Sequence, residues 1–485
     1  MRAALLVPVT LVLLLGAAGA VSTAAAQGQV APPSEPPAPA PARAPSLLTT
    51  NPFLGGVPAG TATSEPLSLS ILDAINRALE HNLGVLMAQE GVGRAQGARW
   101  RALSGLLPTV SGRVSETRQV VNLAAFGFPL PPGIPAIVGP FNVFDARVYL
   151  TQAVLDFHAL NDARAEAHNI AAAEFSYKSA RDLVVLVAAN AYLQALAASS
   201  RADSARAQVE TASALHNQAV DLRQGGIVAG IEVLRAEVQL NTERQRATAT
   251  QNDFEKAKLQ LAHIIGLPLG QVITLSTELP EVPVPDMTLE QAVERAYQAR
   301  PDYQAANERV RAAESAREAI AGERLPSVHV DAHYGDLGLS VADAHSTYAV
   351  VGAVNVPIFQ GRRTHGRLLE ADADLRDRRA QVEDLKATIY YEVRTAFLDL
   401  QASSEQLQVA TGSRQLAAQQ LTQARDRFAA GVASNIEVVQ AQEAVALANE
   451  EYISALYLYN VGKAVLARGL GVAENAVRQY LGGVR

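Results

Sequence analysis

One stretch of the chain occurs twice, and this internal repeat strongly restricts the folds that the chain can adopt. Residues 425–442 read RDRFAAGVASNIEVVQAQ, and residues 221–237 read DLRQGGIVAGIEVLRAE. The shared Ile-Glu-Val carries Glu232 in one copy and Glu437, 205 positions later, in the other. In each copy a helical pattern ends at a glycine turn and a second helical pattern follows, with the glutamate in its first turns. Each copy therefore predicts the tip of a helical hairpin.

The repeat extends well beyond the two tips. Leu107 and Leu325, each followed by proline, are 218 positions apart, whereas Gly266 and Gly471, which close the return helices, are 205 apart. The difference falls mainly in a loop between two strand-like segments, which is shorter in the second copy. Insertions are best tolerated in such loops.

Each repeat is predicted as helix, strand, loop, strand, very long helix, tight turn and shorter helix. The first helix is expected at 69–103, and the first long helix at 158–223, a stretch without proline. A helix of that length spans roughly 100 Å, which favours a coiled-coil arrangement over a compact domain. The second long helix is expected at 362–430. Two shorter helices together match the length of a long one, so we expect them to flank it end to end.

Four segments alternate between apolar and polar residues with a period of two, which is typical of strands. Between the first two, residues 123–142 contain five prolines and three glycines, and a loop is predicted there. The expected strands follow Pro108, cover 143–157, and occupy 327–334 and 348–356 in the second repeat, with a loop at 336–345.

The predicted organisation begins with a secretory signal peptide at 1–26, where Arg2 precedes an apolar run and small residues. Residues 27–66, rich in proline and alanine, are expected to form a flexible leader. The two repeats follow at 67–280 and 281–485. No later run of about 18 apolar residues is apparent, so contact with a membrane is expected through strands. The chain has no cysteine, which excludes a lipid anchor on an N-terminal cysteine.

Four strands cannot close a barrel of useful width, and open sheet edges are not stable in lipid. Three chains would supply twelve strands with an apolar outside and a polar lumen. The predicted fold class is mainly α with a small transmembrane β part. It comprises two repeats of long-helix hairpins that form an α-helical tunnel, plus four strands per chain toward a 12-stranded trimeric barrel.

Other classes of function find little support. The net charge is −7, with acids and bases interspersed, which indicates solvated helix surfaces and no nucleic-acid partner. No phosphate-binding glycine loop, nucleophile elbow or paired-histidine motif is present, so neither an enzyme nor a cofactor is expected. His329 and His333 share a strand face but lack a third ligand, and no metal site is predicted.

From about Leu67 to Leu481 the chain, with its repeated tips and strands, resembles the TolC-like family of outer-membrane efflux proteins. The resemblance rests on the paired tips GGIVAGIEVLRAE and AAGVASNIEVVQAQ, the two Leu-Pro junctions, and the apolar-Gly endings at Gly266 and Gly471. It implies a homotrimeric channel in the outer membrane, in contact with its lipid. The resemblance also implies a periplasmic adaptor, an inner-membrane pump, and export of drugs, metal ions or proteins, as in tripartite efflux or type I secretion.

The resemblance also suggests residues for the periplasmic entrance. Glu437 matches an acidic entrance position, whereas Gln440 replaces a second acid, Phe428 replaces a gating tyrosine and Ala433 replaces an arginine. These differences argue against a hydrogen-bonded lock of the family's kind. Glu232 and Glu437 are expected to form an acidic collar; alternatively, each acid merely occupies a first helical turn, where the helix dipole favours it.

Other residues at the tips are candidates for contact with the adaptor. The apolar residues at the supposedly exposed turns favour partner docking, whereas the arginines could equally be ordinary solvated charges. The candidates are Gly226, Ile227, Val228, Gly431, Val432, Ala433, Arg223 and Arg427. The alternative function, a periplasmic coiled-coil adaptor of the membrane-fusion class, also has a signal peptide and helical hairpins. The strand alternation and the doubled hairpin favour the channel.

Overall fold

The computed structural model describes residues 51–127, 133, 135–276, 287–430 and 432–480. The predicted signal peptide and most of the predicted leader lie outside these residues. The end of the leader is not a free chain, however, because Val57 donates its amide to the His81 carbonyl at 2.8 Å and Ala59 donates to the Gly266 carbonyl at 3.1 Å. The short helix η1 (Pro52–Leu54) precedes the first repeat. In the first repeat the elements are β1 (Leu67–Leu69), α1 (Ile71–His81), α2 (Leu83–Ser104), β2 (Thr109–Asn122), η2 (Leu123–Phe126), β3 (Ile137–Leu155), α3 (Phe157–Gln224), α4 (Gly230–Ile264) and β4 (Ile273–Leu275). In the second they are α5 (Leu289–Ala299), α6 (Pro301–Gly322), β5 (Ser327–Gly338), β6 (His345–Asn355), α7 (Arg363–Ala429), α8 (Asn435–Gly469) and α9 (Ala473–Tyr480).

The first helix of each repeat is interrupted, and the prediction of one continuous helix at 69–103 is therefore wrong. Asn82 adopts an extended backbone conformation, and its side chain caps α2 by accepting from the Gly84 amide at 2.9 Å. The fully buried Asn82 amide also donates to the Phe53 carbonyl at 2.9 Å and the Ile264 carbonyl at 3.3 Å. A buried amide with these partners fixes the break, because each unsatisfied polar atom would cost free energy.

The equivalent break in the second repeat uses an ion pair in place of an amide. Arg300 is 3% exposed and donates to Asp302 at 2.6 Å and to Glu392 at 2.6 Å, and Pro301 starts α6. Burial alone would raise the pKa of Asp302, but hydrogen bonds from Arg300 hold it below its ordinary value. Both repeats thus bend at the same place by different chemistry.

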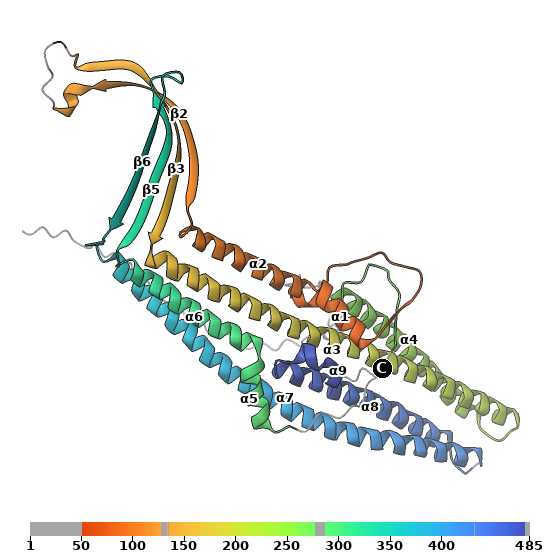
Figure 1. Cartoon of the computed structure of the whole chain (residues 1–485). Coiled ribbons are helices and arrows are strands. Elements are labelled where there is room, and N and C mark those ends of the chain that lie inside the picture. The colour runs from red at the N-terminus through yellow and green to blue at the C-terminus, as the bar shows by residue number, and fades with distance from the viewer. Residues whose placement is uncertain (1–50, 128–132, 134, 277–286, 431, 481–485) are drawn as a thin grey trace, which may run out of the picture. The chain divides into compact units, whose positions relative to one another are not determined.

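Four strands form one antiparallel sheet in the order β2-β3-β5-β6 (Figure 1). The predicted loop at 123–142 is too long, because β3 begins at Ile137 and pairs it with Asn122 of β2. Pro140 lies in this part of β3, where the ladder shifts register between Gln119 and Val121, and an irregular ladder tolerates a residue without an amide proton. A small parallel sheet of β1 and β4 was not predicted.

The two faces of the four-stranded sheet differ as the alternation predicts. On one face, apolar side chains are largely exposed in the single chain, namely Val110, Val114, Val148, Tyr334, Tyr348, Val350 and Val354. On the other face, Arg147 pairs with Asp145 and lies 3.2 Å from Nε2 of His333, and Thr151 donates to Asp331 at 2.9 Å. An apolar face beside a polar face is the pattern of a barrel wall between lipid and water.

The long helices lie beside the shorter ones as expected. Helix α3 contacts α2 and α4 of its own repeat, and α7 contacts α6 and α8 (Figure 1). The repeats are joined because α3 also packs against α6 and α8. Apolar residues spaced by multiples of seven form buried seams along these helices, with Leu240 and Leu261 in α4 and Leu375, Val382, Ile389 and Ala396 in α7. These seams hold each hairpin together.

Helix α3 contains an apolar stretch that was not predicted from the sequence. In the part of the chain that the structure describes, it is the single helix long and apolar enough to cross a membrane, so the prediction of no further apolar run is wrong. However, 61% of its apolar window is buried. The window is rich in small residues such as Ala188, Ala189 and Ala195, all completely buried. The apolar composition of α3 reflects its position among several other helices, because alanine side chains allow helices to pack closely on more than one side.

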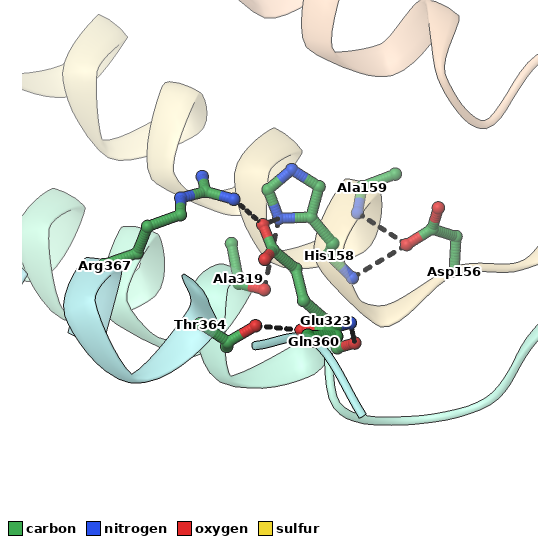
Figure 2. Close-up of polar contacts among 8 residues, drawn as sticks. All are labelled: Asp156, His158, Ala159, Ala319, Glu323, Gln360, Thr364 and Arg367. Atoms are coloured by element: carbon green, nitrogen blue, oxygen red, sulfur yellow. Dashed lines mark hydrogen bonds and ion pairs between the residues drawn. The ribbon is translucent and has the colours of Figure 1, made fainter. Parts of the chain in front are cut away.

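A polar network lies where the strands pass into the helices (Figure 2). Asp156 follows β3 and caps α3 by accepting from the amides of His158 and Ala159. Glu323, just after α6, pairs with Arg367 of α7 and lies 3.8 Å from Nδ1 of His158. The carboxylate therefore links three helices from both repeats at the base of the sheet.

Lys463 of α8 is a completely buried cation. Its ammonium lies 4.9 Å from the centre of the Tyr459 ring, and burial lowers the pKa of Lys463 to about 8. Lys258, 205 positions earlier, lies over Phe254 in the same way but forms an ion pair with Glu255 at 2.7 Å. The two repeats therefore carry a lysine at equivalent positions, and it is buried in the second repeat and partly exposed in the first.

This burial predicts a stability that rises with pH. Between about pH 8 and pH 10.5 the unfolded chain holds a proton on Lys463 that the folded chain has released. Unfolding is then disfavoured by up to about 1.4 kcal/mol for each pH unit. Lys463→Met should remove this rise, measured as the difference in thermal midpoint from wild type across that range. Lys258→Met is the matched control, and an identical pH dependence in wild type and Lys463→Met would contradict the assignment.

Hairpin tips and the candidate entrance site

The first hairpin turn is a short glycine-containing connection between α3 and α4. Gly226 adopts a positive φ of 73°, which glycine accepts without steric cost. Ile227 donates its amide to the Leu222 carbonyl at 2.9 Å, which ends α3. The second turn joins α7 and α8, but Gly431 lies outside the described residues. Both hairpins predicted from the repeated sequence are present.

Apolar side chains are exposed at both turns. Ile227 is 69% exposed and Val432 is 66% exposed, whereas Val228 and Ala433 are half-buried. The two exposed residues occupy the same place in the repeat. These exposed side chains are the ones predicted to contact the adaptor, and that contact remains a prediction.

The predicted acids lie in the first turns of their helices, Glu232 in α4 and Glu437 in α8. Each has an arginine partner within its own hairpin: Arg235 lies 2.7 Å from Glu232, and Arg427 lies 2.9 Å from Glu437. The helix dipole and these exposed or half-exposed ion pairs both favour the acids there. Both glutamates thus occupy a first helical turn, as the simpler interpretation expects. The acidic collar remains a prediction.

The remaining predicted residues differ in their surroundings. Arg223 folds over the start of α4, where its guanidinium carbon lies 3.5 Å from the position that a Cβ on Gly230 would take. Gln440 is exposed. Phe428 is only 6% exposed and belongs to a hydrophobic cluster with Val438 and Ala441. In the single chain Phe428 therefore packs α7 against α8.

A groove between α4 and α8 extends from the two tips. Its volume is about 390 Å³, and it is lined by Ile231, Leu234, Arg235, Val238, Gln239, Ile436, Val439, Gln440 and Glu443. Ile231 and Leu234 correspond to Ile436 and Val439 after a shift of 205 positions. The groove is thus built by the same positions of two repeats.

Sequence reasoning identified the tips but missed the groove. The signal was available: Ile231, Leu234 and Val238 recur at steps of three and four residues, beside the buried seam of Val233, Ala236 and Leu240. A second apolar stripe on a helix whose first stripe is already buried indicates a second contact surface. No group of three or more acidic or histidine residues suited to a metal ion occurs in the described ranges.

The fold and these tips define a class: a membrane channel in which strands with one apolar face continue into long helical hairpins. The sequence model of the outer membrane efflux protein family matches residues 74–267 and 292–472, which is more than half of the chain and covers both repeats. The chain belongs to this family and is an outer-membrane channel for efflux. The family is a transport family, and membership favours the channel over the periplasmic adaptor.

Individual relatives support the same conclusion. The chain is 22% identical to the outer membrane protein TolC of Escherichia coli over 343 residues, which cover 68% of the chain and 70% of TolC. Similar solved structures include the CmeC outer membrane channel of Campylobacter jejuni, with a TM-score of 0.71, 16% identity, and coverage of 90% of this chain and 96% of that one. VceC of Vibrio cholerae has a TM-score of 0.70 at 19% identity, covering 83% and 96%. At such identities these structures support the fold.

Proposed function

We propose that the chain forms a homotrimeric channel-tunnel that exports compounds from the periplasm across the outer membrane. The observation that carries this proposal is the four-stranded sheet, whose outer strands β2 and β6 each pair on one side only. Unpaired backbone groups at two edges are costly in lipid, and four strands cannot enclose a pore. Pairing β2 of one copy with β6 of the next closes a barrel of twelve strands.

The helices supply the tunnel. Strand β3 passes into α3 through the single residue Asp156, so barrel and helices form one continuous wall in each chain. We infer that the helices extend into the periplasm, where a signal peptide at 1–26 would direct the chain. The cargo is proposed to be drugs, other toxic compounds or metal ions, or proteins in a type I secretion system.

The tips and the groove are the proposed contacts of this tunnel with its partners. Exposed apolar residues from two repeats, flanked by Arg235 and Glu443, suit the helical hairpin of a periplasmic adaptor, because helices commonly bind in apolar grooves. The adaptor would in turn connect the tunnel to an inner-membrane pump. Glu232 and Glu437, six carboxylates in a trimer, would surround the entrance and favour cations.

Cysteine cross-linking tests the closed barrel. The chain contains no cysteine, so introduced pairs have no background. One cysteine at Arg113 of β2, combined in turn with each residue from 349 to 353 of β6, should give covalent trimers for those partners that lie opposite it. Covalent trimers at one register, read on denaturing gels of outer-membrane fractions, would support closure. A monomer for every pair, in protein extracted by salt or carbonate, would refute it.

The acidic collar predicts a change in ion selectivity. Glu437→Gln removes three carboxylates per trimer while keeping the side-chain size, so the preference for cations should fall. The measurement is the reversal potential of single channels in a salt gradient at low ionic strength, where charges are least screened. Glu80→Gln, which changes an exposed acid on α1, is the control. An unchanged cation preference in Glu437→Gln would refute the collar and leave the helix dipole and the ion pair with Arg427 as the explanation of Glu437.

The groove predicts a loss of export without a loss of assembly. Leu234→Arg places a long charged side chain on the apolar wall, and docking of an adaptor helix there should weaken because apolar contact is lost and the guanidinium must be desolvated. In a strain that lacks the wild-type channel, this variant should fail to restore resistance to a panel of drugs, dyes and metals. Leu259→Arg, at an exposed leucine farther along α4, should restore it. Full resistance with Leu234→Arg would exclude the groove as a docking site.

A further inference from the structure

The loop between β6 and α7 exposes two large apolar side chains. Ile358 is 95% exposed and Phe359 is 86% exposed, and Ile358 is the most exposed large apolar residue in the part of the chain that the structure describes. Neighbouring Val356 is 55% exposed. Two adjacent apolar side chains left almost fully in water in the single chain require a cover.

The loop continues the apolar face of the sheet. In β6 the residues that face outward are Tyr348, Val350 and Val354, every second residue apart from Gly352. The same alternation runs past the end of the strand through Val356 to Ile358. The exposed apolar face of β6 is therefore followed directly by the exposed apolar residues of the loop.

Three arginines lie close to the apolar pair along the chain or beside the contact between Gln360 and Glu323. Arg324, which follows α6, and Arg362 and Arg363, at the start of α7, are all exposed. None of these three arginines forms an ion pair among the described residues, whereas the nearby Glu323 is already paired with Arg367 (Figure 2). The excess charge at this site is thus available to an anionic partner.

The loop is held in place from both sides. The Gln360 amide donates to the Glu323 carbonyl at 3.1 Å, and the Thr364 hydroxyl donates to the Gln360 side chain (Figure 2). Gly361 and Arg362 both adopt positive φ, 58° and 64°, which turns the chain sharply into α7. A constrained turn loses little entropy when its neighbouring side chains bind a surface.

We propose that this loop is a lipid anchor, in which Ile358 and Phe359 enter the inner leaflet of the outer membrane and the three arginines bind the phosphates of anionic phospholipids. This rests on the proposed function, because the sidedness follows from helices that extend into the periplasm. Guanidinium groups bind phosphate well, and apolar residues flanked by arginines are typical of a membrane boundary.

A second copy of the chain could also cover Ile358 and Phe359, but electrostatic repulsion makes it a less favourable partner than lipid. In a closed barrel the edge that approaches β6 is β2 of the next copy, which follows α2. The last part of α2 carries Arg99 and Arg101, both exposed and without an ion pair among the described residues. A protein contact there would bring arginines toward arginines, whereas a phosphate surface neutralises both sets.

Tryptophan quenching by brominated phospholipids tests the insertion. The single native tryptophan, Trp100, is replaced by phenylalanine, and one tryptophan is introduced as Phe359→Trp, Val350→Trp or Val432→Trp in full-length protein in vesicles. Phe359→Trp should be quenched by bromine near the headgroup end of the acyl chain. Val350→Trp, on the outer face of β6, should be quenched by deeper bromine, and Val432→Trp at the hairpin tip should not be quenched.

The outcomes separate this proposal from the proposed function. Quenching of Val350→Trp without quenching of Phe359→Trp would overturn the anchor and leave the barrel intact, and a blue-shifted Phe359→Trp emission would then identify a neighbouring copy as the cover. Absence of quenching at Val350→Trp would instead reject the barrel.

A preference for anionic lipid tests the arginines. Brominated phosphatidylglycerol should quench Phe359→Trp more strongly than brominated phosphatidylcholine at equal mole fraction. Arg324→Gln, Arg362→Asn and Arg363→Gln should each weaken this preference, by up to about fivefold for each charge near the surface; asparagine is chosen at 362 because it tolerates positive φ. Arg425→Gln is the control. Equal quenching by both lipids would refute the phosphate contacts.

Discussion

Backbone hydrogen bonding at the edges of the sheet is the constraint on which the rest of the architecture depends. Strands β2 and β6 each offer one row of unpaired amides and carbonyls, and lipid cannot satisfy them. The apolar face of the sheet nevertheless excludes water as its solvent. The cylinder completed by identical copies, which we propose, would satisfy both demands. The long helices follow from this, because Asp156 caps α3 directly at the end of β3 and carries the wall onward.

The two repeats solve the same structural problems with different residues, and the differences are informative. At the break in the first helix, Asn82 satisfies backbone carbonyls in one repeat, and Arg300 forms a buried ion pair in the other. Entry into the long helix is capped by Asp156 in the first repeat, whereas in the second it follows the turn at Arg362. Other features are shared, because Glu232 and Glu437 occupy the same helical turn at the tips and a capping box starts both α1 and α5.

Much of the fold could be predicted because its signals are periodic. The seams through Leu240 and Leu375, and the alternation in β5 and β6, repeat over many residues, so a local exception does not hide them. The misses are local. The break at Asn82 depends on the carbonyls of Phe53 and Ile264, and the early start of β3 depends on pairing with β2. Such contacts join residues distant in sequence, and no periodic pattern records them.

The sequence by itself determined the order of the elements, the twofold repeat, the faces of the strands and the position of the hairpin tips, since all of these arise from local periodicity and from turn residues such as Gly226. Only the tertiary structure decided what surrounds each candidate residue. It placed Phe428 in the hairpin core, paired Glu437 with Arg427, and joined Ile231 to Ile436 in one groove. The reason is physical: burial and ion pairing are set by packing between helices, which the sequence of either helix alone does not contain.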